Sequence, residues 1–196
     1  GNTVTKRIQW SLYLPEPEAS QVEAVRRLLD PVQSSLIPAH VTLCREDELA
    51  VVDTDPLESR LADARAECVT LHFGKPEVFH GHGILLPCIA GEEAFHALRV
   101  HLLGSPDIRR QVPHLTLAHP RNPKSAGNCL ANANLLPDMG AVHFTRVSII
   151  EQAGAAPWRV LQTYELQETK RDNGTPRSAL RAIVDAGCEK RGPLGN

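Results

Sequence analysis

The sequence has few aromatic residues and no excess of basic charge. Aromatic side chains account for 4% of its 196 residues, and the formal net charge is −2 with neutral histidines. Few rings are therefore available to stack on bases, and no broad positive field exists to attract a long nucleic acid. These shortages argue against a protein that binds long duplexes, whereas the 42% hydrophobic content is ordinary for a globular chain.

Paired cysteines and long apolar runs are missing as well. The odd number of cysteines, their wide spacing and the lack of a CxxC pair predict reduced thiols in a cytoplasmic protein. The residues Gly1–Arg7 contain no apolar stretch typical of a signal peptide, and no run approaches transmembrane length. We therefore expect no membrane association. The cysteines are Cys44, Cys68, Cys88, Cys129 and Cys188.

What the sequence does contain is one short pattern that occurs twice. Residues 38–43 read Pro-Ala-His-Val-Thr-Leu, and residues 113–117 read Pro-His-Leu-Thr-Leu. In a β-strand, residues i and i+2 share a face, so each histidine should lie beside its threonine while the apolar residues point into a core. An imidazole next to a hydroxyl can hold a phosphate oxygen and move a proton. The paired side chains are His40 with Thr42 and His114 with Thr116.

The hydrophobic periodicity predicts an α+β domain over residues 1–166, followed by a C-terminal extension over residues 167–196. The expected strands are Ile8–Leu14, a segment from His40 to about Arg45, Cys68–Phe73, Gly83–Ile89, Val112–Ala118, Ala141–Gln152 and Trp158–Leu166. The expected helices are Glu18–Leu29, Pro56–Ala66, Gly91–Leu103, Gly127–Leu136 and, in the extension, Ser178–Ala186.

The duplicated pattern resembles the hallmark of the 2H phosphoesterase superfamily, two His-x-Thr/Ser motifs that are each followed by an apolar residue. Within that superfamily the chain looks most like the bacterial 2′-5′ RNA ligase and RNA 2′,3′-cyclic phosphodiesterase group, from about Arg7 to Leu166. The resemblance implies a bilobal fold, with two pseudo-symmetric, antiparallel-rich sheets and helices around a central cleft. It also implies an enzyme without cofactors, in which His40 and His114 act as acid and base and Thr42 and Thr116 bind phosphate.

The expected activity is metal-independent hydrolysis, or reversible formation, of 2′,3′-cyclic phosphate or 2′-5′ phosphodiester bonds in RNA ends or nucleotides. One group must deprotonate the nucleophile and another must protonate the leaving oxygen, and imidazole, with a pKa near about 6.5, suits both tasks. The sequence leaves open which histidine is the base. It also leaves open a non-catalytic module that holds RNA ends or nucleotides on the same fold. The expected partner is a nucleotide or an RNA end with a 2′,3′-cyclic phosphate, bound by a monomer.

Two aromatic residues are further candidates for substrate binding. Trp158 follows the turn at residues 154–157, and it either stacks a base or packs within its hairpin. Tyr13 shares the polar face of the first strand, which either lines the cleft or faces solvent. Trp10 alternates with apolar residues on the other face and is predicted to lie in the core.

A metal-dependent hydrolase is a competing interpretation. His80 and His82 are spaced as a possible zinc pair and His72 is near in sequence, but no further ligand at a suitable spacing is evident. The chain also departs from the bacterial ligase group, because residues 37–39 before the first motif are Ile-Pro-Ala and aromatic residues are scarce around the first strand. This departure leaves the substrate and the subfamily open.

Overall fold

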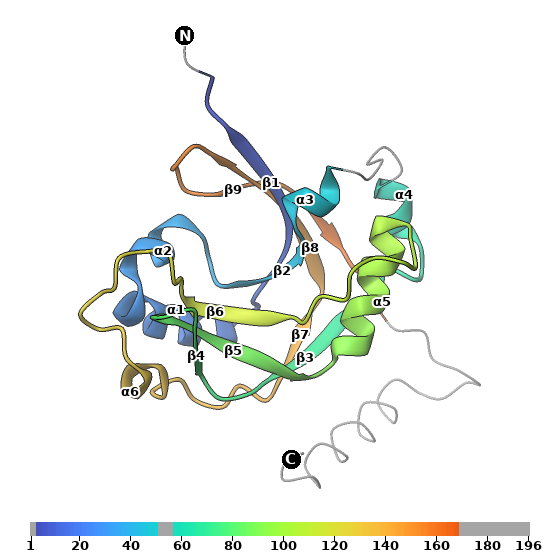
Figure 1. Cartoon of the computed structure of the whole chain (residues 1–196). Coiled ribbons are helices and arrows are strands. Elements are labelled where there is room, and N and C mark those ends of the chain that lie inside the picture. The colour runs from blue at the N-terminus through green and yellow to red at the C-terminus, as the bar shows by residue number, and fades with distance from the viewer. Residues whose placement is uncertain (1–2, 51–56, 169–196) are drawn as a thin grey trace, which may run out of the picture.

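The computed structural model describes residues 3–50 and 57–168, which form two antiparallel sheets with helices packed around them (Figure 1). The first sheet has the strand order β2-β1-β8-β9, so its strands come from both ends of the described chain. Its strand β1 pairs with β2 on one edge and with β8 on the other. The bounds are β1 Lys6–Tyr13, β2 His40–Cys44, β8 Arg146–Ala153 and β9 Arg159–Glu165.

The second sheet is built around β5. The strands β3 and β4 follow one another along one edge of β5, β6 pairs with the other edge, and β7 pairs with the outer edge of β3. All the strands of this sheet come from one continuous stretch of chain. The bounds are β3 Val69–Phe73, β4 Glu77–Phe79, β5 Gly83–Ala90, β6 His114–Ala118 and β7 Ala141–Phe144.

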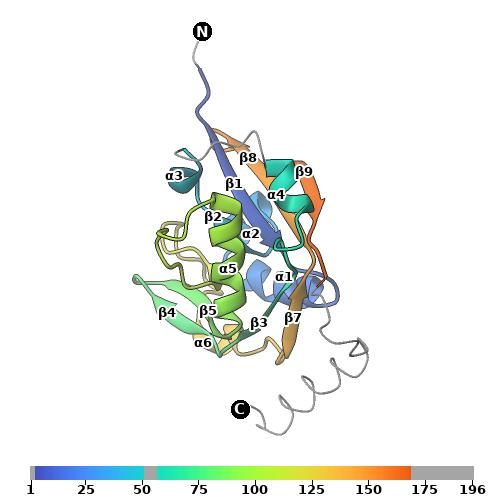
Figure 2. The same cartoon turned by 90° about the vertical axis from the view of Figure 1, so that its right-hand side faces the viewer.

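The helices cover the apolar faces of the sheets. Helix α1 packs against β6. Helix α5, which faces the viewer in Figure 2, packs against β2 and β3. Trp10 and Phe144 are among the largest fully buried side chains, and the predicted core position of Trp10 is confirmed. The helix bounds are α1 Glu18–Leu29, α2 Pro31–Leu36, α3 Glu46–Leu49, α4 Leu57–Ala62, α5 Glu92–Leu103 and α6 Leu130–Ala133.

The predicted α+β architecture of two antiparallel sheets is confirmed, but one predicted strand is wrong. The segment Ala141–Gln152 forms two strands, because β7 belongs to the second sheet and β8 to the first. Val142 and Val147 are both fully buried on either side of the break at Thr145. The apolar pattern therefore runs through a point where the chain leaves one sheet and enters the other.

Two further expectations concern a helix in the C-terminal extension and the absence of membrane-spanning segments. The helix predicted at Ser178–Ala186 lies outside the described residues. Across the ranges that are described, every helix is too short or too polar to cross a membrane.

Candidate active site

The two motif strands have the same pattern of burial. In β2 and in β6 the first and third residues are half-buried, whereas the second, fourth and fifth are buried. This pattern confirms the predicted alternation, in which the histidine and threonine of each motif share one face. The half-buried residues are His40 and Thr42 in β2 and His114 and Thr116 in β6.

Each motif histidine is oriented by the carbonyl oxygen two residues before it. His40 Nδ1 lies 2.9 Å from the oxygen of Pro38, and His114 Nδ1 lies 3.4 Å from the oxygen of Val112. A carbonyl oxygen can only accept a hydrogen bond, so Nδ1 carries the proton in both neutral rings. In both rings Nε2 is therefore the nitrogen that can exchange a proton with a substrate.

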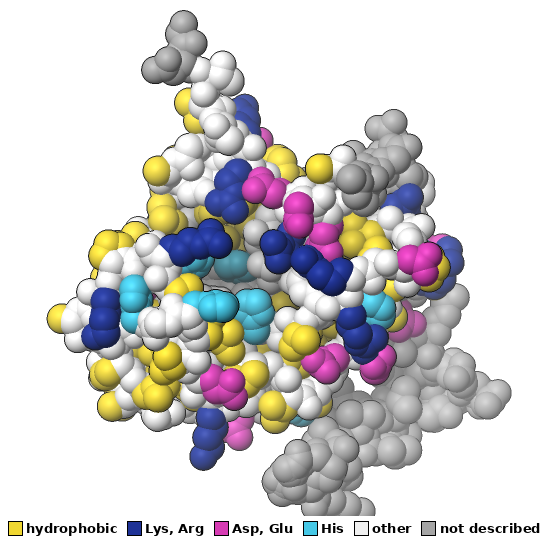
Figure 3. Space-filling view, viewed as in Figure 1, with side chains coloured by type: hydrophobic (Ala, Val, Ile, Leu, Met, Phe, Trp, Pro, Cys, Tyr) yellow, Lys and Arg dark blue, Asp and Glu magenta, His cyan; other side chains and the backbone are white. Residues whose placement is uncertain are grey.

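The two histidines are close enough to affect each other electrostatically. Strands β2 and β6 lie in contact, and Figure 3 shows histidine side chains gathered in a hollow over these strands, with lysine and arginine side chains along its rim. Burial is the main reason that the pKa of His40 falls to about 4, and the charges of Arg26 and His114 add to the effect despite the hydrogen bond to Pro38. His40 is therefore neutral at pH 7 and able to accept a proton.

An ion pair on α1 fixes the segment that leads into His40. Arg26 Nη1 donates to Glu23 Oε1 at 2.6 Å, and Arg26 Nη2 donates to the carbonyl oxygen of Ile37 at 2.8 Å. The other Glu23 oxygen accepts the backbone N–H of Ala39 at 2.7 Å. Because Arg26 is only 1% exposed, solvent screens these contacts weakly and they hold the approach to His40 in place.

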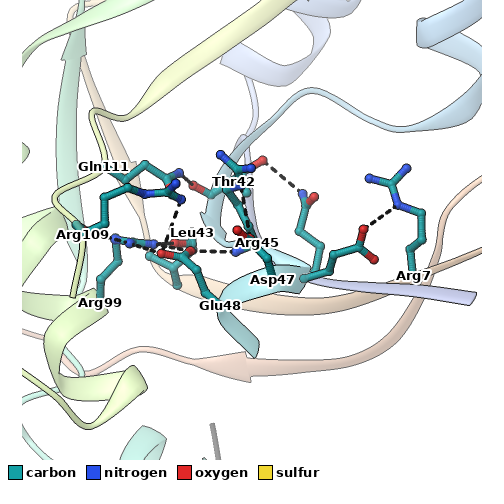
Figure 4. Close-up of polar contacts among 11 residues, drawn as sticks. Arg7, Thr42, Leu43, Arg45, Asp47, Glu48, Arg99, Arg109 and Gln111 are labelled. Carbon is teal, nitrogen blue, oxygen red and sulfur yellow. Dashed lines mark hydrogen bonds and ion pairs between the residues drawn. The ribbon is translucent and has the colours of Figure 1, made fainter. Parts of the chain in front are cut away.

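A second buried arginine joins the two motif segments (Figure 4). Arg99, on α5, donates to the Glu48 carboxylate with both Nη atoms, at 2.9 and 2.5 Å. The same guanidinium donates to the carbonyl oxygen of Leu43 at 2.6 Å and to that of Arg109 at 3.0 Å. Leu43 follows Thr42 in β2, and Arg109 lies on the approach to β6, so one side chain links the supports of both histidines.

Thr42 is held by hydrogen bonds to its side chain and to its backbone. Gln9 Nε2 donates to Thr42 Oγ1 at 3.1 Å, and Gln111 Nε2 donates to the Thr42 carbonyl oxygen at 3.0 Å. Since Thr42 Oγ1 accepts from Gln9, its own hydroxyl proton remains available for another acceptor. The hydroxyl is therefore prepared to donate to an oxygen atom in the cleft.

We expect Thr42→Val and Thr116→Val each to lower kcat/KM by roughly 10- to 100-fold. If the motif threonines bind a phosphate group, each substitution removes one hydrogen bond to a charged oxygen while keeping the branched shape, and such a bond contributes about 1.5–3 kcal/mol. Steady-state assays with a 2′,3′-cyclic nucleotide would measure the loss. Thr163→Val on the exposed strand β9 is the matched control and should leave the rate unchanged. Equal rates for all three variants would contradict phosphate binding by the motif threonines.

The structure places Tyr13 beside a motif histidine and Trp158 farther along the sheet. The Tyr13 ring lies edge-on to the His40 ring, with a centroid distance of 6.4 Å and an interplanar angle of 86°. Burial raises the pKa of Tyr13 to about 12, so its phenol keeps its proton. Trp158 packs under the Arg7 guanidinium at 5.3 Å and lines a cavity of about 220 Å³ together with Gln9. Gln9 connects this cavity to Thr42.

The histidines considered as metal ligands do not converge in the part of the chain that the structure describes. His82 Nε2 donates to the carbonyl oxygen of Asn122 at 2.6 Å, and His80 packs its ring against Phe79 at 5.4 Å. The residues that the structure describes place only one set of three ligand atoms together, and neither of these histidines belongs to it. The observed geometry therefore favours the two-histidine interpretation.

The residues that support the motifs were not predicted from the sequence. Gln9 is 33 positions from Thr42, and Glu48 is 51 positions from Arg99. A local sequence pattern cannot predict contacts between residues that lie so far apart in the chain. One signal was present, because Arg99 follows Leu98 and lies four residues after Phe95 on the apolar face of a predicted helix. A charged residue on that face requires a buried partner.

This arrangement, in which each of two antiparallel sheets presents one His-x-Thr strand to a shared cleft, is a 2H phosphoesterase fold. The family model described as the 2′-5′ RNA ligase superfamily matches residues 14–156, and the chain belongs to that superfamily. No curated protein sequence matches the chain.

Solved structures agree on the fold. Escherichia coli LigT complexed with ATP matches with a TM-score of 0.54 and 17% identity, over 85% of this chain and 100% of LigT. LigT complexed with 3′-AMP matches with a TM-score of 0.53 and 16% identity, over 83% of this chain and 99% of LigT. A crystal structure described as a phosphoesterase matches with a TM-score of 0.53 and 14% identity, over the same shares. At sequence identities of 14–17%, these matches establish the fold and not the activity.

Proposed function

We propose that this protein is a metal-independent phosphoesterase that hydrolyses, or reversibly forms, 2′,3′-cyclic phosphate or 2′-5′ phosphodiester bonds in nucleotides or RNA ends. The observation that carries the proposal is the matched pair of histidines. Each ring is anchored through Nδ1 to the carbonyl oxygen two residues upstream, and the two strands that carry the histidines, β2 and β6, lie in contact. Two imidazoles that present Nε2 to one cleft suit the two proton transfers of phosphodiester chemistry.

In the hydrolytic direction we assign His40 as the base and His114 as the acid. The lowered pKa of His40 keeps its Nε2 unprotonated at neutral pH. In the proposed step His40 takes a proton from a water molecule as the water oxygen attacks phosphorus. The bond from phosphorus to one ribose oxygen breaks, and His114 delivers a proton to that oxygen. Formation of the bond would use the same residues in the opposite roles.

Hydroxyl groups around the histidines would stabilise the negative charge that builds on phosphate. Thr42 and Thr116 share the faces of the histidines, and the Thr42 hydroxyl is oriented by Gln9. Tyr13, protonated at neutral pH and next to His40, would donate a further hydrogen bond. Trp158 and Arg7 line the adjacent cavity, where a base or a further phosphate would bind.

Nucleotides and RNA ends are the proposed substrate class. LigT, which shares this fold, has been crystallised with ATP and with 3′-AMP. The formal charge of −2 provides no extended basic surface for a long duplex, whereas the arginines near the cleft suffice for a few phosphates. We further propose that the protein acts as a monomer in the cytoplasm.

A substrate panel tests the proposal. The purified protein would be assayed, in EDTA, with 2′,3′-cyclic nucleotides, 2′-5′ dinucleotides and RNA oligomers that end in a cyclic phosphate. We expect multiple turnovers on at least one of these substrates and none on 3′-5′ linked oligomers of the same sequence. Tight binding without turnover would instead support the non-catalytic module. Turnover that EDTA abolishes would contradict metal independence.

The pH dependence of kcat/KM should report the lowered pKa of His40. Activity should persist below pH 6.5 and fall as the pH approaches about 4, because protonated His40 can no longer accept a proton. Assays of a 2′,3′-cyclic nucleotide across pH, with folding confirmed by circular dichroism at each point, would show this acid limb. An acid limb unchanged in His40→Asn, measured on residual activity, would overturn the assignment of the base.

A further inference from the structure

The second sheet brings a thiol and an imidazole to the same face, away from the cleft. Thr70 of β3 lies directly opposite His143 of β7, so these two side chains share a face. Cys68 precedes Thr70 by two positions and points to that face as well. Strands β5 and β3 separate β7 from the motif strand β6, a distance of roughly 14 Å at the usual strand spacing.

Backbone hydrogen bonds add a carboxylate to this pair. Leu166 N–H donates to the oxygen of Thr145 at 2.8 Å, and Gln167 N–H donates to the oxygen of Ala66 at 2.7 Å. The oxygen of Gln167 accepts the N–H of Cys68 at 2.8 Å. The segment after β9 is thus attached next to both β3 and β7, and the next residue, Glu168, extends its side chain to the thiol and the imidazole.

The three ligand atoms have nearly the spacing of a zinc site. They all lie within 4.8 Å of one another, and Glu168 Oε1 is 3.7 Å from Cys68 Sγ and 3.8 Å from His143 Nε2. Zinc bonds of about 2.0–2.3 Å at tetrahedral angles place ligand atoms roughly 3.3–3.6 Å apart. Binding an ion would shorten the two distances to Glu168 Oε1 by a few tenths of an ångström, and it would shorten the distance from Cys68 Sγ to His143 Nε2, which is at most 4.8 Å, by up to about 1 Å.

The surroundings of the imidazole suit a metal ligand. Thr70 Oγ1 is 2.8 Å from His143 Nδ1, so a proton on Nδ1 can be held there while Nε2 offers its lone pair to an ion. The His143 and Glu168 side chains are 38% and 51% exposed, which leaves a path for an ion and room for a water ligand. The site therefore has an outer hydrogen bond and access from solvent.

We propose that Cys68, His143 and Glu168 bind a zinc ion that fastens the end of β9 to the outer edge of the second sheet. A thiolate, an imidazole and a carboxylate together select zinc over magnesium or calcium, which prefer oxygen ligands only. The ion takes the place of the thiol proton that lies between Cys68 and Glu168 in the metal-free protein. The site is independent of the proposed catalysis and departs from the expectation of a chain without metal ligands.

Zinc titration of the full chain, stripped with EDTA and dialysed, tests this site. Competition with a chromophoric chelator should show one zinc ion per chain, and zinc should raise the melting temperature. Cobalt(II) in place of zinc should give a thiolate-to-metal charge-transfer band. Cys68→Ser, His143→Gln and Glu168→Gln should each weaken zinc binding at least about tenfold, and Thr70→Val should weaken it by about tenfold through the lost outer hydrogen bond.

Two control variants separate this site from other zinc ligands. Cys88→Ser removes another half-buried thiol, and His114→Asn removes an imidazole from the cleft. Both should bind zinc like the unchanged protein. Glu168→Gln changes an exposed side chain and should fold normally, so its loss of binding would support the site directly. Absence of stoichiometric zinc in the unchanged protein, or loss of zinc only in His114→Asn, would overturn the proposal.

Discussion

Replacing either motif histidine by asparagine is expected to lower kcat by at least about 100-fold, because each substitution removes an acid or a base that typically accounts for 10²–10⁴ in rate. Asparagine is the informative replacement. Its side-chain amide can still donate to the carbonyl oxygen of Pro38 or Val112, as Nδ1 does now, but it cannot titrate. A loss of rate in His40→Asn or His114→Asn would therefore reflect proton transfer and not a misplaced strand.

The matched control is His80→Asn, which removes an exposed imidazole outside the motifs. His80 has φ 46°, a left-handed conformation that asparagine tolerates well. This variant should turn over substrate at the unchanged rate. Circular dichroism and thermal unfolding should be compared for the three variants. Near-normal turnover in a folded His40→Asn or His114→Asn protein would refute the acid–base pair and leave the fold without its proposed chemistry.

Replacing Arg99 by methionine is expected to lower the free energy of unfolding by about 3–5 kcal/mol, the usual result of removing one partner of a buried ion pair. Arg99 is fully buried, and the Glu48 side chain that it contacts is only 12% exposed. The carbonyl oxygens of Leu43 and Arg109 would lose donors at the same time. Denaturant unfolding monitored by circular dichroism would measure the change.

Arg146→Met provides the comparison for this prediction. Arg146 and Glu165 form an ion pair whose side chains are both 66% exposed, and such pairs contribute about 0–1 kcal/mol. The double variant Arg99→Met/Glu48→Met should be more stable than Arg99→Met alone, because it removes the largely buried Glu48 carboxylate, whose remaining cationic partner in Arg99→Met is Arg109 at 3.7 Å. If Arg99→Met were as mild as Arg146→Met, the buried network could not be what holds the two motif segments together.

The sequence predicted the motif strands because their information is local. A period of two decides which face a residue occupies, and the identical burial of β2 and β6 follows from their identical patterns. The short helix α2, which was not predicted, also has local signals in the sequence, namely Asp30, whose carboxylate accepts the Gln33 N–H, and Pro31 at the first turn.

The remaining features depend on contacts that no local pattern encodes. The break between β7 and β8 at Thr145 depends on which sheet each half joins, and both halves are equally apolar. The three-residue strand β4 is exposed along most of its length and is too short to show a repeating apolar pattern. The side chains that orient the motifs, such as Gln9 and Arg99, come from segments far away in the chain.

The division of strands between the sheets has a consequence for the order in which the nascent protein can fold. When residue 144 has left the ribosome, every strand of the second sheet is present, including the one that carries His114. The first sheet then has only β1 and β2, and an isolated two-stranded pair is marginally stable in water. The lobe that begins the chain must therefore wait for the last strands to be synthesised, and His40 reaches its final surroundings after His114.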